Sequence, residues 1–305
     1  MTGIYDSGSG GRYAAEILHR LAPSERLLLR LDRENAPYGS KSEGELSDLV
    51  SENISRLASF GIERVLIACC TASTVYHKLP EELKKISIPI VTPTARIAER
   101  LTENGRITLI ATDRTVASDL FSREIRGAEV IPIAAQPLVS IIDRGIADGS
   151  RTLMRALAEI REATRHTALK TFGDENESKE TCGYRARSED DQGAPPHHVS
   201  EGVSKWAREP LFGDPTEMAT YGKGKHLSEK DEDIARDYIF SLARQVMESG
   251  ADTLILGCTH FHGIQKTLSE IFRIFRKKIK TVSSAEVGAY MAYRRISGKR
   301  EITGS

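Results

Sequence analysis

Short apolar runs alternate with longer amphipathic stretches along the first half of the chain. The runs have the length of buried strands, and the stretches between them place apolar residues three and four positions apart, as on one face of a helix. The predicted strands are Gly3-Ile4-Tyr5, Leu27-Leu28-Leu29, Val65-Leu66-Ile67-Ala68, Ile90-Val91, Ile107–Ile110 and Val130–Ile133. This alternation predicts an α/β fold with mostly parallel sheets.

The pattern breaks near residue 165 and resumes near residue 238. Between Thr171 and Lys230 the chain is polar, charged and rich in Gly and Pro. Because a loop this long is uncommon inside a compact domain, we expect a solvent-exposed and partly disordered insertion at about residues 165–235. Beyond it, helical spacing is carried by Tyr238, Ile239, Leu242, Val246 and Met247.

The chain carries no net charge. Its 305 residues include 43 Lys and Arg against 43 Asp and Glu, so neither a nucleic acid nor an anionic membrane would attract the whole molecule. The one basic cluster, from Arg273 to Lys280, is interleaved with apolar residues and is expected on the solvent-facing side of a surface helix. No signal-peptide pattern or membrane-spanning run is visible, so we expect a cytoplasmic protein.

The sequence contains four cysteines, and two of them stand in similar surroundings. They are Cys69, Cys70, Cys182 and Cys258, which are expected to be reduced in the cytoplasm. The segments Phe60–Thr71 and Ser249–His260 share one layout: a helix ending at Gly, two polar residues, an apolar strand, a small residue and then Cys. Eight residues separate Gly61 from Cys69, and eight separate Gly250 from Cys258. Cys182 falls in the predicted insertion and is expected to be inert.

The shared layout has a structural meaning. A Gly after a helix supplies the left-handed cap, and a run of four apolar residues suits a strand that is buried on both faces. Cys69 and Cys258 would then lie at the carboxyl ends of their strands, which is where open α/β sheets place ligands. Two such halves that face each other would bring two thiols to one cleft.

Two thiols on opposite sides of a carbon can act as a pair of acid/base groups. One thiolate removes a proton from one face and the other thiol returns a proton to the opposite face, which inverts a stereocentre without a cofactor. Asp6, in the turn after the first strand, is placed to tune Cys69. His260, two residues beyond Cys258, is placed to tune Cys258.

Other interpretations of these residues remain open. A buried Cys is most often a small core residue. Cys69, Cys70, Cys258 and His260 would form a Cys3His zinc site, although the usual two-residue gaps between Cys ligands are missing. The glycine-rich turn from Asp6 to Gly11 lacks a Walker lysine and the third glycine of a dinucleotide-binding motif, but it can still hold a carboxylate through its backbone N–H groups.

The motifs together resemble those of glutamate racemase, in the cofactor-independent aspartate/glutamate racemase superfamily. The strong matches are Asp6-Ser7-Gly8-x-Gly10-Gly11, Pro37-Tyr38-Gly39-x-Lys41-Ser42, Ala68-Cys69-x-Thr71-Ala72-Ser73 and Leu256-Gly257-Cys258-Thr259-His260-Phe261. Weaker matches are Ala111-Thr112-x-x-Thr115-Val116-x-Ser118 and Pro137-Leu138-Val139-x-x-x-Asp143-x-Gly145. They occur in family order and span the chain except for the insertion.

The resemblance implies two pseudo-symmetric α/β domains with the active site in the cleft between them. Domain 1 would take residues 1–94 and 278–305, and domain 2 would take residues 95–277, including the insertion. The expected catalytic residues are Cys69, Cys258, Asp6, His260 and Asp143, the last in the place where the family carries a glutamate. The expected substrate-binding residues are Asp6, Ser7, Tyr38, Gly39, Cys70, Thr71, Thr112, Thr115, Thr259 and His260.

The activity implied is the interconversion of L-glutamate and D-glutamate, which supplies D-glutamate for peptidoglycan synthesis and so for cell shape. No cofactor and no metal are expected. The partner would be a small acidic amino acid rather than a nucleic acid or a membrane, and a homodimer is left open as the assembly.

The chain departs from the family pattern in three places. Cys70 stands where the family carries an asparagine that hydrogen-bonds the substrate, and a thiol is only a weak donor and acceptor. Losing a hydrogen bond to a charged group costs about 1.5–3 kcal/mol, or an order of magnitude or more in binding. Asp143 is one methylene shorter than the usual glutamate, and the insertion is foreign to the family. These departures keep two rivals open: a racemase of aspartate or another acidic amino acid, and a catalytically degenerate binding or regulatory protein.

Overall fold

The computed structural model of the chain describes residues 1–139, 142 and 229–298. The catalytic candidate Asp143 and most of the predicted insertion lie outside these described residues. The end of the predicted insertion is wrong by a few residues. Helix α12 (Glu229–Glu248) already begins at Glu229, where Glu229, Lys230 and Glu232 are residue types of good helix propensity.

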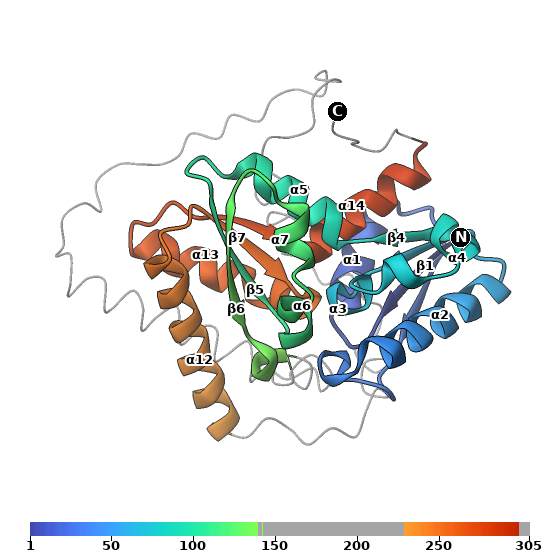
Figure 1. The fold of residues 1–305 in the computed structure, drawn as a ribbon, viewed down its shortest axis with the longest axis horizontal. Helices are drawn as coiled ribbons and strands as arrows, with labels where there is room; N and C mark the ends of the chain where they lie inside the picture. Colours follow the sequence, from blue (N-terminus) through green and yellow to red (C-terminus); the bar gives the residue numbers. More distant parts are fainter. Residues whose placement is uncertain (140–141, 143–228, 299–305) are drawn as a thin grey trace.

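Two four-stranded parallel sheets form the frame of the molecule and lie side by side (Figure 1). The first sheet has the order β2-β1-β3-β4 and consists of β1 (Thr2–Asp6), β2 (Leu27–Leu31), β3 (Arg64–Ile67) and β4 (Ser87–Pro89). The second has the order β6-β5-β7-β8 and consists of β5 (Arg106–Ala111), β6 (Glu129–Ala134), β7 (Thr253–Gly257) and β8 (Lys280–Ser283). The predicted α/β class with parallel sheets is confirmed.

The two sheets have the same strand order, so β3 and β7 occupy equivalent places. The glycines that precede them also behave alike: φ is 73° at Gly61 and 72° at Gly250. This left-handed conformation costs glycine little and other residues more. The predicted glycine caps are therefore confirmed, and the repeat seen in the sequence is a repeat of structure.

Helices cover both sheets and connect their parallel strands. The longer ones are α1 (Gly11–Leu21), α2 (Glu43–Ser59), α5 (Val91–Leu101), α12, α13 (Gln265–Ile274) and α14 (Ser284–Ile296). The shorter ones are η1 (Tyr38–Ser40), α3 (Cys70–Ser73), η2 (Tyr76–Lys78), α4 (Glu81–Ile86), α6 (Asp113–Ala117), α7 (Leu120–Glu124) and η3 (Thr259–Ile264). Local signals set some of these boundaries, as where Ser42 and Glu45 form a capping box at the start of α2.

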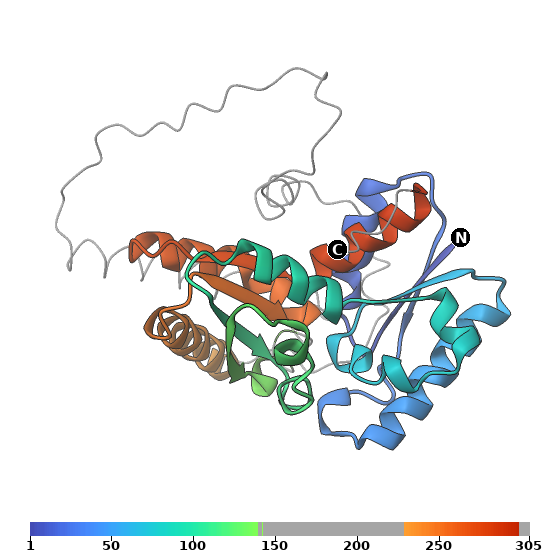
Figure 2. The ribbon, with the colours of Figure 1, turned by 45° about the horizontal axis from the view of Figure 1, so that its top comes forward.

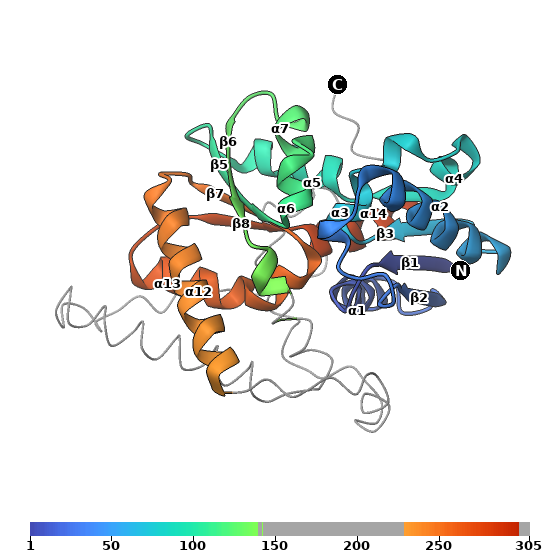
Figure 3. The same cartoon turned by 60° about the horizontal axis from the view of Figure 1, so that its bottom comes forward.

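A continuous apolar core joins the two halves. It includes Ile4 and Leu66 from the first sheet, Ile107 and Ile255 from the second, and Val287 from α14, all nearly inaccessible to solvent. Helix α14 packs against both α1 and α5 where the halves meet (Figure 2). Helices α3 and α6, which follow β3 and β5, contact each other at the same junction (Figure 3). The core therefore fixes the carboxyl ends of the two sheets close together.

Two details of the sequence prediction are corrected. The fourth strand is Ser87–Pro89, whereas Ile90 is the N-cap of α5 and Val91 its first residue. Pro93 fits in this helix because the first helical turn needs no N–H donors. The strand β8 pairs with β7 in the second sheet, so the return of the chain to the first half comes at α14, a few residues after the predicted boundary at 278. Within the described residues, none of the helices combines the length and apolarity needed to cross a bilayer.

Candidate functional site

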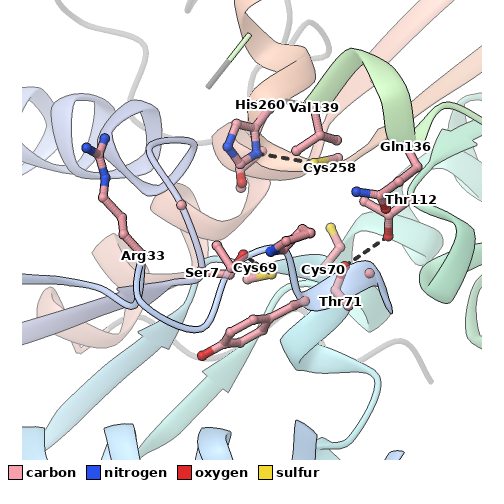
Figure 4. A pocket seen from close by; sticks show the side chains of 16 residues that line it. Ser7, Arg33, Cys69, Cys70, Thr71, Thr112, Gln136, Val139, Cys258 and His260 are labelled. Carbon is pink, nitrogen blue, oxygen red and sulfur yellow. Dashed lines mark hydrogen bonds between the residues drawn. The ribbon is translucent and has the colours of Figure 1, made fainter. Parts of the chain in front are cut away.

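A pocket of about 280 Å³ lies at the carboxyl ends of both sheets, with residues of both halves in its wall (Figure 4). The predicted residues that line it are Ser7, Tyr38, Gly39, Cys69, Cys70, Thr71, Thr112, Cys258, Thr259 and His260. Asp6 and Thr115 lie just behind the wall, where they contact residues that line it. The structure thus brings together residues separated by up to about 250 positions in the chain.

Cys69 stands on the first-sheet side of the pocket, two residues after β3 ends at Ile67. Its side chain is 6% exposed, and the backbone N–H of Ala72 donates to Sγ over 3.4 Å. Ser7 Oγ lies 3.4 Å from this sulfur and 3.5 Å from Asp6 Oδ1. The Ser7 hydroxyl therefore stands between the thiol and the carboxylate that the sequence paired directly.

The surroundings of Cys69 favour the neutral thiol. Burial, with a further contribution from the nearby Asp6 carboxylate, raises the pKa of Cys69 to about 11. The hydrogen bonds from Ser7 and Ala72 oppose this rise. The ligand-free pocket therefore disfavours a thiolate at Cys69, and a positive charge nearby would favour one.

Cys258 stands on the second-sheet side, directly after β7, and is 8% exposed. Figure 4 shows its sulfur and that of Cys69 on opposite sides of the pocket. Burial, and then the neighbouring Cys70 and Cys69 sulfurs, raise the pKa of Cys258 well above its usual range. His260 Nδ1 lies 3.4 Å from Cys258 Sγ, close enough for a ring N–H to stabilise a thiolate.

The tautomer of His260 follows from its second contact. The backbone N–H of Gly10, at the start of α1, donates to His260 Nε2 over 3.3 Å. A nitrogen that accepts a hydrogen bond carries no proton, so the ring proton is assigned to Nδ1, which faces the sulfur. This approach requires glycine at position 10, because a Cβ there would lie 2.4 Å from Thr259 Oγ1 and 2.8 Å from His260 Nδ1.

A second hydrogen bond joins the halves beneath the pocket. Thr259 Oγ1 donates to Asp6 Oδ2 over 2.9 Å, and the N–H of Gly8 donates to Asp6 Oδ1 over the same distance. Asp6 is fully buried, so these donors compensate part of the cost of burying its charge. The position of the carboxylate is thereby fixed relative to both cysteines.

Three threonine hydroxyls form a cluster next to Cys70, two of them in the pocket wall and that of Thr115 behind it. Thr71 Oγ1 lies 2.9 Å from Thr112 Oγ1 and 3.2 Å from Thr115 Oγ1. Thr112 also caps α6, where it accepts the N–H of Thr115. Hydroxyls can turn to donate to a ligand, and this cluster is therefore suited to bind an anionic group.

Tyr38 is held by a buried polar network. Its hydroxyl donates to Asp32 Oδ2 and contacts the hydroxyl of Tyr5, and Asp32 also accepts hydrogen bonds from Asn35 and Asn53. Burial raises the pKa of Tyr38 above its usual range. This network fixes the turn Tyr38–Ser40, which contributes Gly39 to the pocket.

Cys70 lies in the pocket wall and is 2% exposed. Burial raises the pKa of its thiol. The predicted zinc alternative is not supported. Within the described residues, which include Cys69, Cys70, Cys258 and His260, no group of three or more His, Cys, Asp or Glu side chains could hold a metal ion.

Several lining residues were not predicted. They are Gly8, Arg33, Ala36, Pro37, Gln136 and Val139. A signal for two of them was present: Arg33 stands two residues after β2 and Gln136 two residues after β6, and ligands gather at the carboxyl ends of parallel strands. Because the two sheets have the same strand order, Arg33 and Gln136 occupy equivalent places in the two halves.

Comparison with curated proteins supports the family resemblance. The chain is 32% identical over 175 residues to a glutamate racemase of Desulforudis audaxviator, a match covering 56% of this chain and 64% of that protein. It is 33% identical to a glutamate racemase of Roseiflexus, over 50% of this chain and 57% of that protein. The matches thus span somewhat more than half the length of these relatives. No protein-family model matches the chain.

Solved structures of low sequence identity share the fold. A glutamate racemase isoform of Bacillus anthracis superposes with a TM-score of 0.59 at 21% identity, covering 98% of this chain and 82% of that one. The aspartate racemase of Picrophilus torridus superposes with a TM-score of 0.52 at 15% identity, covering 98% and 94%. The chain therefore resembles the glutamate racemases in sequence and has the two-domain fold of the aspartate/glutamate racemases.

Proposed function

We propose that the chain is an amino-acid racemase that interconverts L-glutamate and D-glutamate by two-base proton transfer. The observation that carries the proposal is the placement of Cys69 and Cys258 at equivalent strand ends, on opposite sides of one small pocket. Pockets for drug-sized ligands start at about 300 Å³, so a cavity of about 280 Å³ suits a smaller molecule such as an amino acid.

The reaction exchanges only hydrogen. The thiolate of one cysteine takes the proton from the substrate α-carbon and becomes a thiol. The thiol of the other cysteine gives its proton to the opposite face and becomes the thiolate. Each turnover therefore inverts the α-carbon and exchanges the roles of Cys69 and Cys258, with no electron passed to a cofactor.

The substrate itself supplies the charge that the thiols need. Burial keeps both cysteines neutral in the ligand-free pocket, since the pKa of Cys69 is about 11 and that of Cys258 is also raised. An ammonium group in the same poorly solvated space lowers the pKa of a nearby thiol. For Cys258, the Nδ1–H of His260 adds stabilisation of the thiolate. For Cys69, we assign Ser7 and Asp6 as the groups that exchange or orient its proton.

The substrate carboxylates would lie against the hydrogen-bond donors of the wall. We place one of them at the hydroxyl cluster of Thr71, Thr112 and Thr115. The glutamate racemase of Francisella tularensis, which shares this fold (TM-score 0.56, 18% identity, covering 99% of this chain and 84% of that one), was solved in complex with D-glutamate. A role in peptidoglycan synthesis, and with it a cytoplasmic location, rests on the family resemblance.

Isotope exchange tests the proposal directly. The purified chain is incubated with L-glutamate in D2O, and the α-carbon is followed by proton NMR while circular dichroism follows the enantiomer ratio. We expect D-glutamate with one solvent deuterium at Cα. The absence of both deuterium uptake and D-glutamate would refute the proposal.

Cysteine variants test the assignment of the two bases. Cys69→Ser and Cys258→Ser should each lower the racemisation rate by at least about a hundredfold, the scale on which positioned acid/base groups act. Cys182→Ser, in the predicted insertion, controls for thiol loss as such. Full activity in either of the first two variants would remove that cysteine from the mechanism.

A second candidate is a racemase of aspartate or another acidic amino acid. It is favoured by Cys70, which lines the pocket where the family carries an asparagine. Parallel assays with L-glutamate and L-aspartate distinguish the two candidates through kcat/KM. Cys70→Asn should improve glutamate turnover if position 70 contacts that substrate, and unchanged kinetics would contradict this account of the position.

A further inference from the structure

Gln136 is a pocket residue to which neither the sequence motifs nor the site described above assigns a role. It follows β6 on a turn that is fixed on both sides: the N–H of Ala135 donates to Ala111 O over 2.8 Å, and Ala135 and Leu138 are fully buried. The backbone therefore has little freedom to carry the side chain elsewhere. Figure 4 shows Gln136 on the same side of the pocket as Cys70 and Thr112.

The two ends of the Gln136 amide are in different surroundings. Oε1 is buried and turned towards the other half: a Cβ on Gly39 would lie 2.1 Å from Oε1 but 3.3 Å from Nε2. Oε1 has no hydrogen-bond partner among the described residues. The NH2 end is the one drawn towards the cavity in Figure 4. An amide packed this tightly presents a donor to whatever occupies the pocket.

We infer that the Gln136 amide binds the substrate carboxylate that lies at the Thr71 and Thr112 hydroxyls, and so supplies the amide that Cys70 lacks. The inference rests on the proposed racemase function. The departure at position 70 removes a strong donor from this part of the wall, since a thiol hydrogen-bonds weakly. Gln136 reaches the same region from the other half of the molecule, opposite Gly39. The two positions together then determine which acidic amino acid fits.

The contact between Gln136 and Gly39 adds a geometric element to this recognition. Gln136 belongs to the second sheet's half and Gly39 to the first, and the amide fits only because Gly39 has no side chain. A carboxylate bound by Gln136 Nε2 would therefore lie where the two halves of the molecule meet. The distance from this carboxylate position to the sulfurs of Cys69 and Cys258 would set the length of the substrate side chain that the pocket accepts.

Two substitutions at position 136 separate binding from packing. Gln136→Leu removes the donor, and Gln136→Glu keeps the shape but replaces the donor with a negative charge. If Gln136 donates to a carboxylate, KM for L-glutamate should rise about ten- to a hundredfold in Gln136→Leu, the range for a lost hydrogen bond to a charged group. It should rise further in Gln136→Glu, with kcat changed less than KM in both. Gln245→Leu, at an exposed glutamine of α12 whose side chain bonds to Ser241, is the matched control.

The outcomes are distinct. A KM within twofold of wild type in Gln136→Glu overturns the inference, because a residue that only fills space tolerates a substitution of the same shape. Isothermal titration with L-glutamate separates this test from that of the proposed function. If the wild type binds glutamate without racemising it, the proposed function fails, while weaker binding by both variants supports the role of Gln136. If the wild type binds neither glutamate nor aspartate, the inference fails as well.

Discussion

The close approach of Gly10 to the second half of the molecule leads to a sharp prediction. Gly10→Ala places a Cβ 2.4 Å from Thr259 Oγ1 and 2.8 Å from both the backbone nitrogen and Nδ1 of His260. All three distances are shorter than real Cβ contacts allow, and one of the atoms is backbone. The η3 turn that carries Thr259 and His260 must therefore move away from α1.

The loss of stability and of turnover in Gly10→Ala can be estimated from the contacts that this movement weakens. Overpacking at a tight site destabilises a protein by about 1–3 kcal/mol. The same displacement weakens the 2.9 Å bond from Thr259 to Asp6, and a hydrogen bond to a charged group is worth about 1.5–3 kcal/mol. His260 would also shift from its 3.4 Å contact with Cys258 Sγ. In the proposed racemase reaction, losing that donor to the thiolate corresponds to about a ten- to hundredfold fall in turnover.

Thermal unfolding and racemase kinetics measure the two effects on the same sample. Gly44→Ala is the matched control, because a Cβ at Gly44 meets no atom within 4 Å. Gly44 is the second residue of α2, and alanine has the higher helix propensity of the two residues. We expect Gly10→Ala to lower the melting temperature and the activity, and Gly44→Ala to raise the melting temperature slightly at unchanged activity. A Gly10→Ala protein with wild-type melting temperature and turnover would refute the close contact.

Two further predictions concern buried ionisable groups. Burial raises the pKa of Glu286 from 4.5 to about 8, so this carboxyl group stabilises the fold below about pH 4.5 and loses that contribution as the pH rises towards 8. Glu286→Gln should therefore increase the free energy of unfolding by up to about 3 kcal/mol at pH 7 and by less than about 1 kcal/mol at pH 5; equal gains in urea unfolding at both pH values would contradict the shift. For Cys69, with a pKa of about 11, the rate of alkylation by iodoacetamide should rise about tenfold per pH unit from pH 7 to pH 10. Peptide mapping of Cys69 that shows a plateau near pH 8.5, as in the denatured chain, would contradict that pKa.

The secondary structure could be predicted from the sequence wherever a few consecutive residues carried the pattern. Strands such as Ile107–Ile110 and Val130–Ile133 have the apolar runs expected of buried parallel strands, and the structure contains them within slightly wider bounds. The edge strand Ser87–Pro89 was missed, because three residues with one large apolar side chain carry no such signal. Its neighbours Ile90 and Val91 are apolar for another reason: they bury the first turn of a helix.

The residues of the candidate site likewise fall into those that the local sequence predicted and those that it did not. Cys69 and Cys258 could be placed at strand ends because Gly61 and Gly250 mark equivalent helix ends eight residues earlier. Gln136 also follows a predicted strand, but nothing in its neighbourhood distinguishes a glutamine that lines a pocket from one on the surface. Its role depends on Gly39, which lies about a hundred residues earlier in the chain and in the other half.

The sequence by itself determined the two parallel sheets and the strand-end cysteines, since strand, turn and cap preferences are properties of a few consecutive residues. Only the tertiary structure decided how the two halves meet. The bonds from Thr259 to Asp6 and from Gly10 to His260 join residues more than 200 positions apart. They exist because a shared apolar core holds the carboxyl ends of both sheets together. That packing sets the proton on His260, the burial that keeps both thiols neutral and the single pocket between them.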